Sequence, residues 1–417
     1  MNDDRLNQFL WYGYFVDRDL GLPLALPGPD TRQAYAQMDE ATLIQRGIDC
    51  WRTAIAAAWS ESPRDSVVPL SGGLDSRAIL AGLLEHTPAR GVETYTYGTP
   101  GTWDFELGNR VAAVAGTRHY AYDLTRYEYS PTALGTIALR SGLRTTVFNH
   151  APLAWIERDL GPEKRYWLGF MGDPLAGAHL PPTASRDWQT AATRFARRNR
   201  RAKSALLTRP GYRPEACLPD RPLAAAQSLV YDEQLDFGVR QQAFVQPHLL
   251  LQGLVYQLPF LQSSWRDYIL SVPLAWRMGQ RLYRHVLTAA YPQLFALPTK
   301  TNYGLALGAP GWARALRRVK LRAGSAARRR FARAAWGTDP LLNYVDFDQG
   351  LRHRTDLKGV VEAYLQAFQR RRVADWIDMA GLWRRHQRGQ ANHADALTLL
   401  ASLEIILQMT EAPGAGV

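Results

Sequence analysis

The chain has 417 residues and carries 50 Lys and Arg against 38 Asp and Glu, a formal net charge of +12. Its 46% hydrophobic and 21% charged residues are typical of a globular protein and exclude a disordered or fibrous one. No stretch approaches the roughly 20 apolar residues of a membrane-spanning helix, and the N-terminal sequence MNDDRLNQF lacks the basic start of a secretory signal. Cys50 and Cys217 offer neither a disulfide framework nor a cysteine zinc site. We therefore expect a cytoplasmic protein with one large domain and an elaboration, or with two domains.

Residues 1–39 are rich in Trp, Tyr, Pro and Gly and predict an irregular lead-in. A helix is expected over 41–60, where apolar residues recur at helical spacing. Strands then alternate with helices, with strands at 66–70, 92–98, 118–124 and 165–172 and helices at 75–85, 104–116, 131–141 and 151–160. Beyond about 185 the pattern is helical, apart from loops at 206–222 and 296–312. This alternation predicts an α/β fold with a doubly wound, mainly parallel sheet and a large helical C-terminal part.

The most informative segment is VVPLSGGLDSR, residues 67–77, where a buried strand runs into paired glycines and a helix begins near Asp75. Adjacent glycines let the backbone turn tightly and approach an anion without a clashing Cβ. The amides of the helix N-terminus, with the hydroxyls of Ser71 and Ser76, form a cradle for phosphate oxygens. A Gly-Gly turn capped by Asp75 or Ser76 is the purely structural alternative. The segment lacks the lysine of a Walker-type phosphate loop.

The SGGLDS sequence resembles the pyrophosphate-binding signature of the PP-loop ATP pyrophosphatases, and its context resembles the synthetase domain of asparagine synthetases and β-lactam synthetases over about residues 70–310. That family splits ATP between its α and β phosphates, activates a carboxylate as an acyl-adenylate and lets an amine displace AMP. The resemblance implies ATP and Mg²⁺ as cofactors. It also implies pyrophosphate binding by the segment Leu70, Ser71, Gly72, Gly73, Asp75 and Ser76, with Asp75 as a metal ligand.

Further matches extend the resemblance along the chain. Tyr97 and Gly98 end a strand that is similar to the family's adenine-flanking strand, and TWDFE (102–106) resembles the segment that opens the next helix. LGFMGDPLAGAH (168–179) resembles a family loop, which implies a nucleotide contact at Gly172 and a second magnesium aspartate at Asp173. LPFLQSSWRDYILSVP (258–273) resembles the family's P-F-L-D segment and the following helix.

Two residues receive catalytic roles from this resemblance. Lys300, in LPTKTNYG (297–304), is similar to a late lysine that contacts the α-phosphate and neutralises charge as pyrophosphate leaves. His179 takes the place of a tyrosine that serves as a base in the β-lactam-forming members. A histidine there can deprotonate an amine near neutral pH, although a histidine bonded to a backbone carbonyl is an equal alternative.

Several positions depart from the family pattern. Position 2 is Asn2 instead of the glutaminase cysteine, so we expect no glutaminase here and an amine that is free ammonia, delivered by a partner protein or part of a larger substrate. Phe170 and Pro174 replace acidic loop residues, and Val255 and Gln257 replace residues that flank P-F-L-D. The replacements leave open whether the enzyme is active, and they favour a carboxylate other than aspartate from a small molecule, peptide or glycan.

The basic charge is uneven: Gly311 to Trp336 holds eight Arg and one Lys with no acid, and a second cluster runs from Arg194 to Lys203. Solvated helix faces explain such clusters, and an anionic partner such as RNA, acidic glycan or lipid is the alternative. A tRNA-modifying PP-loop enzyme of the lysidine-synthetase type and a non-catalytic scaffold therefore stay open beside the leading hypothesis, an amide-forming ligase. We expect a lead-in at 1–40, a synthetase domain at 41–310 and a basic helical extension at 311–417.

Overall fold

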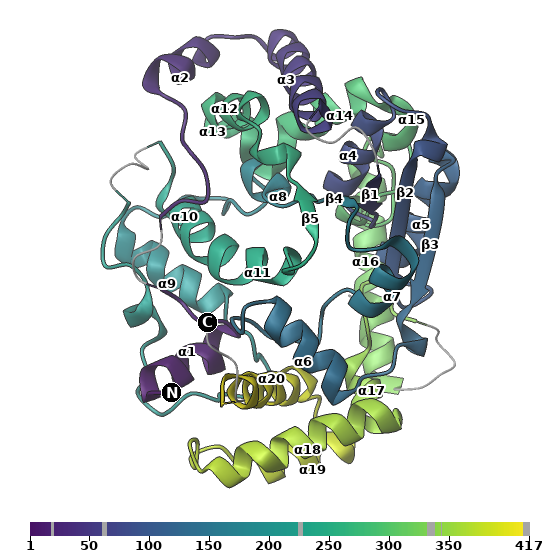
Figure 1. The fold of residues 1–417 in the computed structure, drawn as a ribbon. Coiled ribbons are helices and arrows are strands. Elements are labelled where there is room, and N and C mark those ends of the chain that lie inside the picture. Colours follow the sequence, from purple (N-terminus) through teal and green to yellow (C-terminus); the bar gives the residue numbers. More distant parts are fainter. Residues whose placement is uncertain (18–20, 61–64, 224–227, 332–337, 343, 412–417) are drawn as a thin grey trace.

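The computed structural model describes residues 1–17, 21–60, 65–223, 228–331, 338–342 and 344–411, with side chains left out of the description for 325–331. The described residues form a five-stranded sheet in the order β3-β2-β1-β4-β5, and every pair of neighbours is parallel. The strands are β1 (Ser66–Pro69), β2 (Val92–Gly98), β3 (Arg118–Asp123), β4 (Arg165–Trp167) and β5 (Val255–Gln257). Many helices surround this sheet, so the predicted α/β, doubly wound, mainly parallel fold is confirmed (Figure 1).

The helices of the N-terminal half are α1 (Asp3–Tyr12), α2 (Pro29–Ala36), α3 (Glu40–Ser60), α4 (Asp75–Leu83), α5 (Trp103–Ala115), α6 (Pro131–Arg140), α7 (Leu153–Leu160), α8 (Gly172–Leu175) and α9 (Trp188–Arg198). Those that follow are α10 (Tyr231–Leu235), α11 (Gln246–Leu249), α12 (Ser263–Ser271), α13 (Leu274–Arg277), α14 (Arg281–Ala290), α15 (Pro292–Phe295), α16 (Gly311–Phe331), α17 (Phe347–His353), α18 (Thr355–Arg371), α19 (Met379–Gln387) and α20 (Ala394–Glu411). A π-helical segment, Asp236–Val245, joins α10 to α11.

The central strands β1 and β4 are buried on both faces: successive strand residues point to opposite sides, and each side packs against its own set of helices. In β1, Val68 belongs to a core cluster with α3, α4, α12 and α14, whereas Val67 belongs to a cluster with α7 on the other face. Trp167 and Tyr166 of β4 divide between the same two clusters. The strand order reverses between β1 and β4, so their carboxyl ends flank the topological switch point at which open α/β sheets bind ligands.

A further core cluster joins the two ends of the chain. Leu6 and Phe9 of α1 belong to one cluster with α6, α18 and α20. Figure 1 shows α18, α19 and α20 at the opposite end of the molecule from α2 and α3. The cluster brings together residues from all three predicted regions, and the domain division itself stays a prediction.

The structure corrects three element predictions. The lead-in expected to be irregular contains α1, whose Asn2 side chain caps its N-terminus, and α2, which begins with Pro29. The strand expected over 165–172 ends at Trp167, because Met171 has a left-handed backbone and Gly172 begins α8. The region beyond 185 was expected to be helical and also holds β5, whose three residues pair with β4. Within the described residues, no helix is both long and apolar enough to cross a membrane.

Candidate functional site

The loop between β1 and α4 is held by hydrogen bonds between its own backbone N–H groups and its serine hydroxyls. The Ser71 N–H donates to the Ser76 hydroxyl at 3.3 Å, and the Gly73 N–H donates to the Ser71 hydroxyl at 3.2 Å. Leu74 precedes α4 without a side-chain cap, so the first helical amides have no capping group and carry the partial positive charge of a helix N-terminus. Serine hydroxyls and uncapped amides in one loop suit the binding of phosphate oxygens.

Gly72 is the position where a side chain does not fit. A Cβ there would lie 3.0 Å from the Lys300 Cβ and 3.1 Å from the Trp103 carbonyl oxygen. The Gly72 carbonyl accepts a hydrogen bond from the Lys300 N–H at 2.7 Å. The Gly-Gly loop is thus joined directly to the segment that carries the predicted catalytic lysine.

Asp104 links the same two segments through its side chain. One carboxylate oxygen accepts the Gly72 N–H at 3.2 Å and the other accepts the Lys300 ammonium at 2.5 Å. Asp104 lies in TWDFE at the start of α5. Its carboxylate shows that an oxyanion can be held between the Gly72 amide and Lys300.

Asp75 and Asp173 meet at the switch point. The Asp173 N–H donates to one oxygen of Asp75 at 2.9 Å, and the Tyr283 hydroxyl donates to the other at 2.9 Å. Burial raises the pKa of Asp75 well above its ordinary 3.8, the Asp173 carboxylate raises it further, and the bond from Tyr283 opposes the rise. A buried carboxylate whose ionised form is destabilised by a neighbouring carboxylate suits a divalent cation, and Mg²⁺ sites commonly combine one or two carboxylates with phosphate oxygens.

Two glycines allow the Asp75 side chain to lie close to the segment that carries Asp173. A Cβ at Gly169 would lie 2.7 Å from the Asp75 Cβ, and one at Gly172 would lie 2.4 Å from the Asp75 carboxyl carbon. The Asp173 carboxylate also accepts a hydrogen bond from the side-chain amide of Gln280 at 2.7 Å. The backbone of Gln280 has a left-handed conformation. Such a conformation in a non-glycine residue costs free energy and often occurs at functional sites.

The structure thus brings together the 71–76 loop, Lys300 and the Asp75–Asp173 pair. Leu70, which leads into this loop, is buried, and its N–H donates to the Tyr95 carbonyl at 2.7 Å. Gly98 ends β2, and the Tyr97 ring stacks on Tyr344 with centroids 5.1 Å apart, so part of the expected adenine-flanking surface packs against the protein itself. The nucleotide contacts of Tyr97 and Gly98 stay predictions.

His179 lies in a different place, at the far end of the segment that starts at Asp173. Its Nδ1 is 2.8 Å from a carboxylate oxygen of Asp236, and its backbone carbonyl accepts a hydrogen bond from Arg198 at 3.0 Å. Burial opposes ionisation of Asp236, but the bond and charge of His179, together with Arg240, outweigh it and lower the pKa of Asp236. A carboxylate that holds Nδ1 leaves Nε2 for proton transfer, which is the arrangement of an oriented general base.

The family positions that depart from the pattern have structural roles here. Phe170 is 2% exposed and belongs to the core beside the sheet, and Pro174 lies inside α8. Val255 and Gln257 form the ends of β5. No sequence pattern indicated Tyr283, Gln280, Asp236 or the pairing of Asp104 with the lysine. These residues act through contacts between distant segments, and only the place of Asp104 in TWDFE offered a signal.

The Arg-rich stretch from Gly311 is only partly described. It forms α16, and Trp312, Leu316 and Val319 are exposed on it, whereas Leu321 packs against Trp103 and Leu107. The side chains of its later arginines, from Arg328 onward, lie outside the described residues. A nucleic-acid or other anionic partner for this stretch stays a prediction.

A parallel sheet whose central strand delivers a Gly-Gly loop to a helix N-terminus at the switch point is consistent with a PP-loop-type, doubly wound α/β fold. Residues 61–154 match the family model described as asparagine synthase. This match is consistent with an asparagine synthetase-like domain, and that family suggests an ATP-dependent amidation ligase. The matched range includes Ser71 to Ser76 and Asp104 but ends before Asp173, His179 and Lys300. No curated protein sequence matches the chain.

Proposed function

We propose that this protein is an AMP-forming amide ligase that activates a substrate carboxylate as an acyl-adenylate for attack by an amine or ammonia. A natural-product, peptide or surface-glycan tailoring pathway is the proposed setting. The observation that carries the proposal is the meeting of the Gly-Gly loop, Lys300 and the Asp75–Asp173 pair at the switch point. The family match over the loop supports the same class of reaction.

In the first half-reaction, a carboxylate oxygen forms a bond to the α-phosphorus of ATP, and the bond from that phosphorus to the bridging oxygen breaks. The amides and hydroxyls of residues 71–76 bind the departing pyrophosphate, and Lys300 supports the charge that develops on it. Asp75 and Asp173 would hold Mg²⁺, which neutralises phosphate charge when bound. Lys300 must exchange Asp104 for a phosphate oxygen, and its 33% exposed side chain has room to do so.

In the second half-reaction, the amine nitrogen attacks the acyl carbon and the bond from that carbon to the AMP oxygen breaks. The amine loses a proton, and Nε2 of His179, oriented by Asp236, is the proposed acceptor. The overall proposal is tested by ATP–pyrophosphate exchange and AMP release over a panel of carboxylates with ammonia or amines. Exchange with no carboxylate of any class, in a protein that binds ATP, would contradict it.

Lys300→Met is expected to lower the exchange rate roughly 100- to 1,000-fold, as loss of one oxyanion donor does elsewhere. The free energy of unfolding should change by less than about 1 kcal/mol, because a partly exposed ion pair with Asp104 contributes little. Lys358→Met, which removes the same charge from α18, serves as the control. An exchange rate in Lys300→Met equal to that of the control would remove Lys300 from the mechanism.

His179→Phe is expected to abolish amide formation while pyrophosphate exchange continues. Asp236→Asn should lower amide formation roughly 100-fold, because the imidazole loses the carboxylate that orients its ring. The two half-reactions are measured separately, by exchange and by product release. A parallel fall of both half-reactions in His179→Phe would rule out the assignment as base.

A further inference from the structure

A cavity of about 340 Å³ lies beside His179. Its walls come from three parts of the chain: the end of α1, the helix α9 together with the residues after it, and the π-helical segment. This volume is within the range of small-molecule sites. Its lining is Tyr12, Tyr14, His179, Arg194, Phe195, Arg198, Asn199, Arg200, Arg201, Lys203, Asp232, Asp236, Arg240 and Phe244. The basic cluster that composition assigned to a solvated face therefore walls a cavity.

The cavity has an excess of positive charge that its own acids do not cancel. Six of its lining residues are Arg or Lys, and two, Asp232 and Asp236, are acidic. The Asp232 carboxylate already pairs with the Arg194 guanidinium at 3.1 Å and accepts a hydrogen bond from the Ser185 N–H at 2.7 Å. Asp236 is shared between His179 at 2.8 Å and Arg240 at 3.6 Å. The remaining cations are left without a carboxylate from the cavity wall.

Among these cations, Arg201 gives the clearest evidence of an unpaired positive charge in the cavity. Its guanidinium lies 5.6 Å from the centroid of the Phe244 ring and makes no hydrogen bond or ion pair with the part of the chain that the structure describes. Burial lowers the pKa of Arg201, Asp395 partly compensates, and the nearby Arg240 lowers it further. This partly buried guanidinium has no ion-pair partner among the described residues, so the site is suited to an anion that is not part of the chain.

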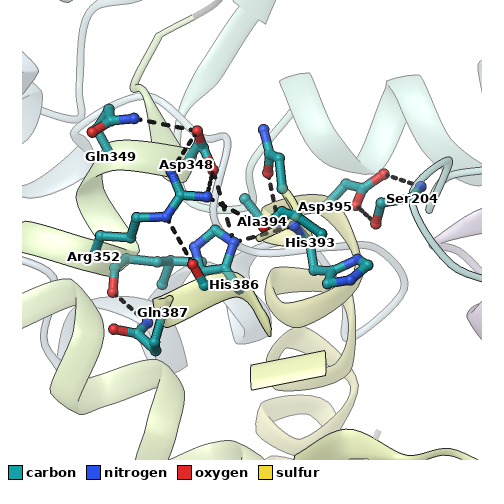
Figure 2. A network of polar contacts seen from close by, with 12 residues as sticks. Ser204, Asp348, Gln349, Arg352, His386, Gln387, His393, Ala394 and Asp395 are labelled. Atoms are coloured by element: carbon teal, nitrogen blue, oxygen red, sulfur yellow. Dashed lines mark hydrogen bonds and ion pairs between the residues drawn. The ribbon is translucent and has the colours of Figure 1, made fainter. Parts of the chain in front are cut away.

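Asp395 positions the cationic loop without neutralising Arg201. Its carboxylate accepts the N–H groups of Lys203 at 2.6 Å and Ser204 at 3.1 Å, and also the Ser204 hydroxyl. Figure 2 shows this contact at the start of α20, beside the network in which Arg352, Asp348 and His386 join α17 to α19. The C-terminal helices therefore fix the loop that carries Arg200, Arg201 and Lys203.

Tyr14 supplies a second, independent sign of a ligand. Its side chain is 2% exposed and stacks on Phe244 with ring centroids 5.4 Å apart. Its hydroxyl is buried and has no hydrogen-bond partner among the described residues. Buried hydroxyls are normally paired, so this residue of the cavity lining carries an unmet hydrogen bond next to the cavity.

We propose that this cavity binds an oxyanion, a carboxylate or a phosphate, on the substrate of the ligase, with Arg201 and Arg240 as charge partners and the Tyr14 hydroxyl as donor. Phe244 and Tyr14 provide the apolar wall. The assignment to a substrate rests on the proposed ligase function, since the segment from Asp173 to His179 connects the two sites. Arg277 reinforces this connection by donating to the Leu175 carbonyl of α8 at 3.0 Å and pairing with Glu233 of α10.

The test is anion binding by calorimetry and thermal shift, with inorganic phosphate and tricarballylate as probes at about 0.15 M salt, where exposed charges are largely screened. Wild type should gain melting temperature with at least one probe, and the probe that binds identifies the anion as phosphate or carboxylate. Arg201→Gln should bind at least about 10-fold more weakly. Without a probe its melting temperature should equal or exceed that of wild type, because a partly buried cation close to Arg240 is removed.

Tyr14→Phe keeps the ring stacking and should leave the unliganded melting temperature unchanged or raised, while binding weakens about 10-fold. Arg197→Gln is the matched control, because this exposed arginine of α9 does not line the cavity. Asp75→Asn should retain probe binding, and Arg201→Gln should retain ATP binding. A failure of the cavity proposal can therefore be distinguished from a failure of the proposed ligase function. No binding by wild type, or equal binding by Arg201→Gln and Arg197→Gln, would overturn the assignment.

Discussion

Asp75→Asn is expected to abolish Mg²⁺-dependent ATP binding while leaving the fold at least as stable as in the wild type. The substitution removes one negative charge but preserves shape. Its oxygen still accepts the Asp173 N–H, and its amide can donate to the Tyr283 hydroxyl. Loss of a proposed direct metal ligand should weaken binding by at least about 100-fold, because changes beyond the ligands already cost about 10- to 100-fold in other metal sites.

The pH dependence of stability has a definite sign. The pKa of Asp75 is raised above 3.8 by burial and by Asp173, so the folded state binds its proton more tightly than the unfolded state does. The contribution of this group to stability is therefore present below its ordinary pKa and is lost as the pH rises through the raised value. Mg²⁺-dependent ATP binding has the opposite dependence, since it requires the ionised pair.

Calorimetry with ATP and Mg²⁺ measures the binding, and thermal melts across pH measure the stability. Asp173→Asn should behave similarly in binding, and Asp49→Asn, which removes an exposed charge from α3, is the control. A large fall in the melting temperature of Asp75→Asn would identify Asp75 as a structural residue. Unchanged Mg²⁺-dependent binding would remove the carboxylate pair from the nucleotide site.

Gly172→Ala is expected to abolish the same binding through a single added methyl group. The new Cβ would lie 2.4 Å from the Asp75 carboxyl carbon, so the carboxylate must leave its position beside Asp173. Overpacking of this kind costs about 1–3 kcal/mol of unfolding free energy. The backbone itself accepts alanine, because Gly172 is not among the positive-φ glycines.

A double-mutant cycle isolates this contact. Adding Asp75→Ala to Gly172→Ala should restore the melting temperature but not ATP binding, since the clash is removed together with the carboxylate. Gly359→Ala is the matched control: it lies in α18 with no atom near its added Cβ, and it should be neutral or stabilising by about 1 kcal/mol. ATP binding by Gly172→Ala at wild-type strength would contradict the predicted displacement.

Sequence patterns predicted the parallel sheet because buried parallel strands and covering helices leave strong, local signals. Four strands and the α4 start at Asp75 were located within a few residues. β5 was missed because its three residues are too short for a periodic pattern, and it exists as a strand only through its pairing with β4. The helices α1 and α2 were missed because their aromatic, Pro- and Gly-rich context resembles a loop.

The charge pattern from Arg194 to Lys203 shows a further limit. Composition alone cannot distinguish a solvated face from a cavity wall, since both consist of arginines at helical spacing. The apolar face of α9, with Ala192 and Phe195, packs against Tyr12 and Tyr14, and this packing turns Arg194 and Arg198 toward the cavity. The position of α1 relative to α9 is a long-range contact that no local pattern encodes.

By itself the sequence determined the α/β class and the Gly-Gly loop at a helix N-terminus, because strand periodicity, glycine turns and helix starts depend on neighbouring residues. The tertiary structure alone decided that Asp75 reaches Asp173 past two glycines and that Tyr283 and Gln280 hold the pair. It also decided that the Arg201 guanidinium stacks on Phe244 and that the Tyr14 hydroxyl has no hydrogen-bond partner among the described residues. These features depend on packing between segments that are far apart along the chain. Burial there changes the energy of a charge, which local sequence does not record.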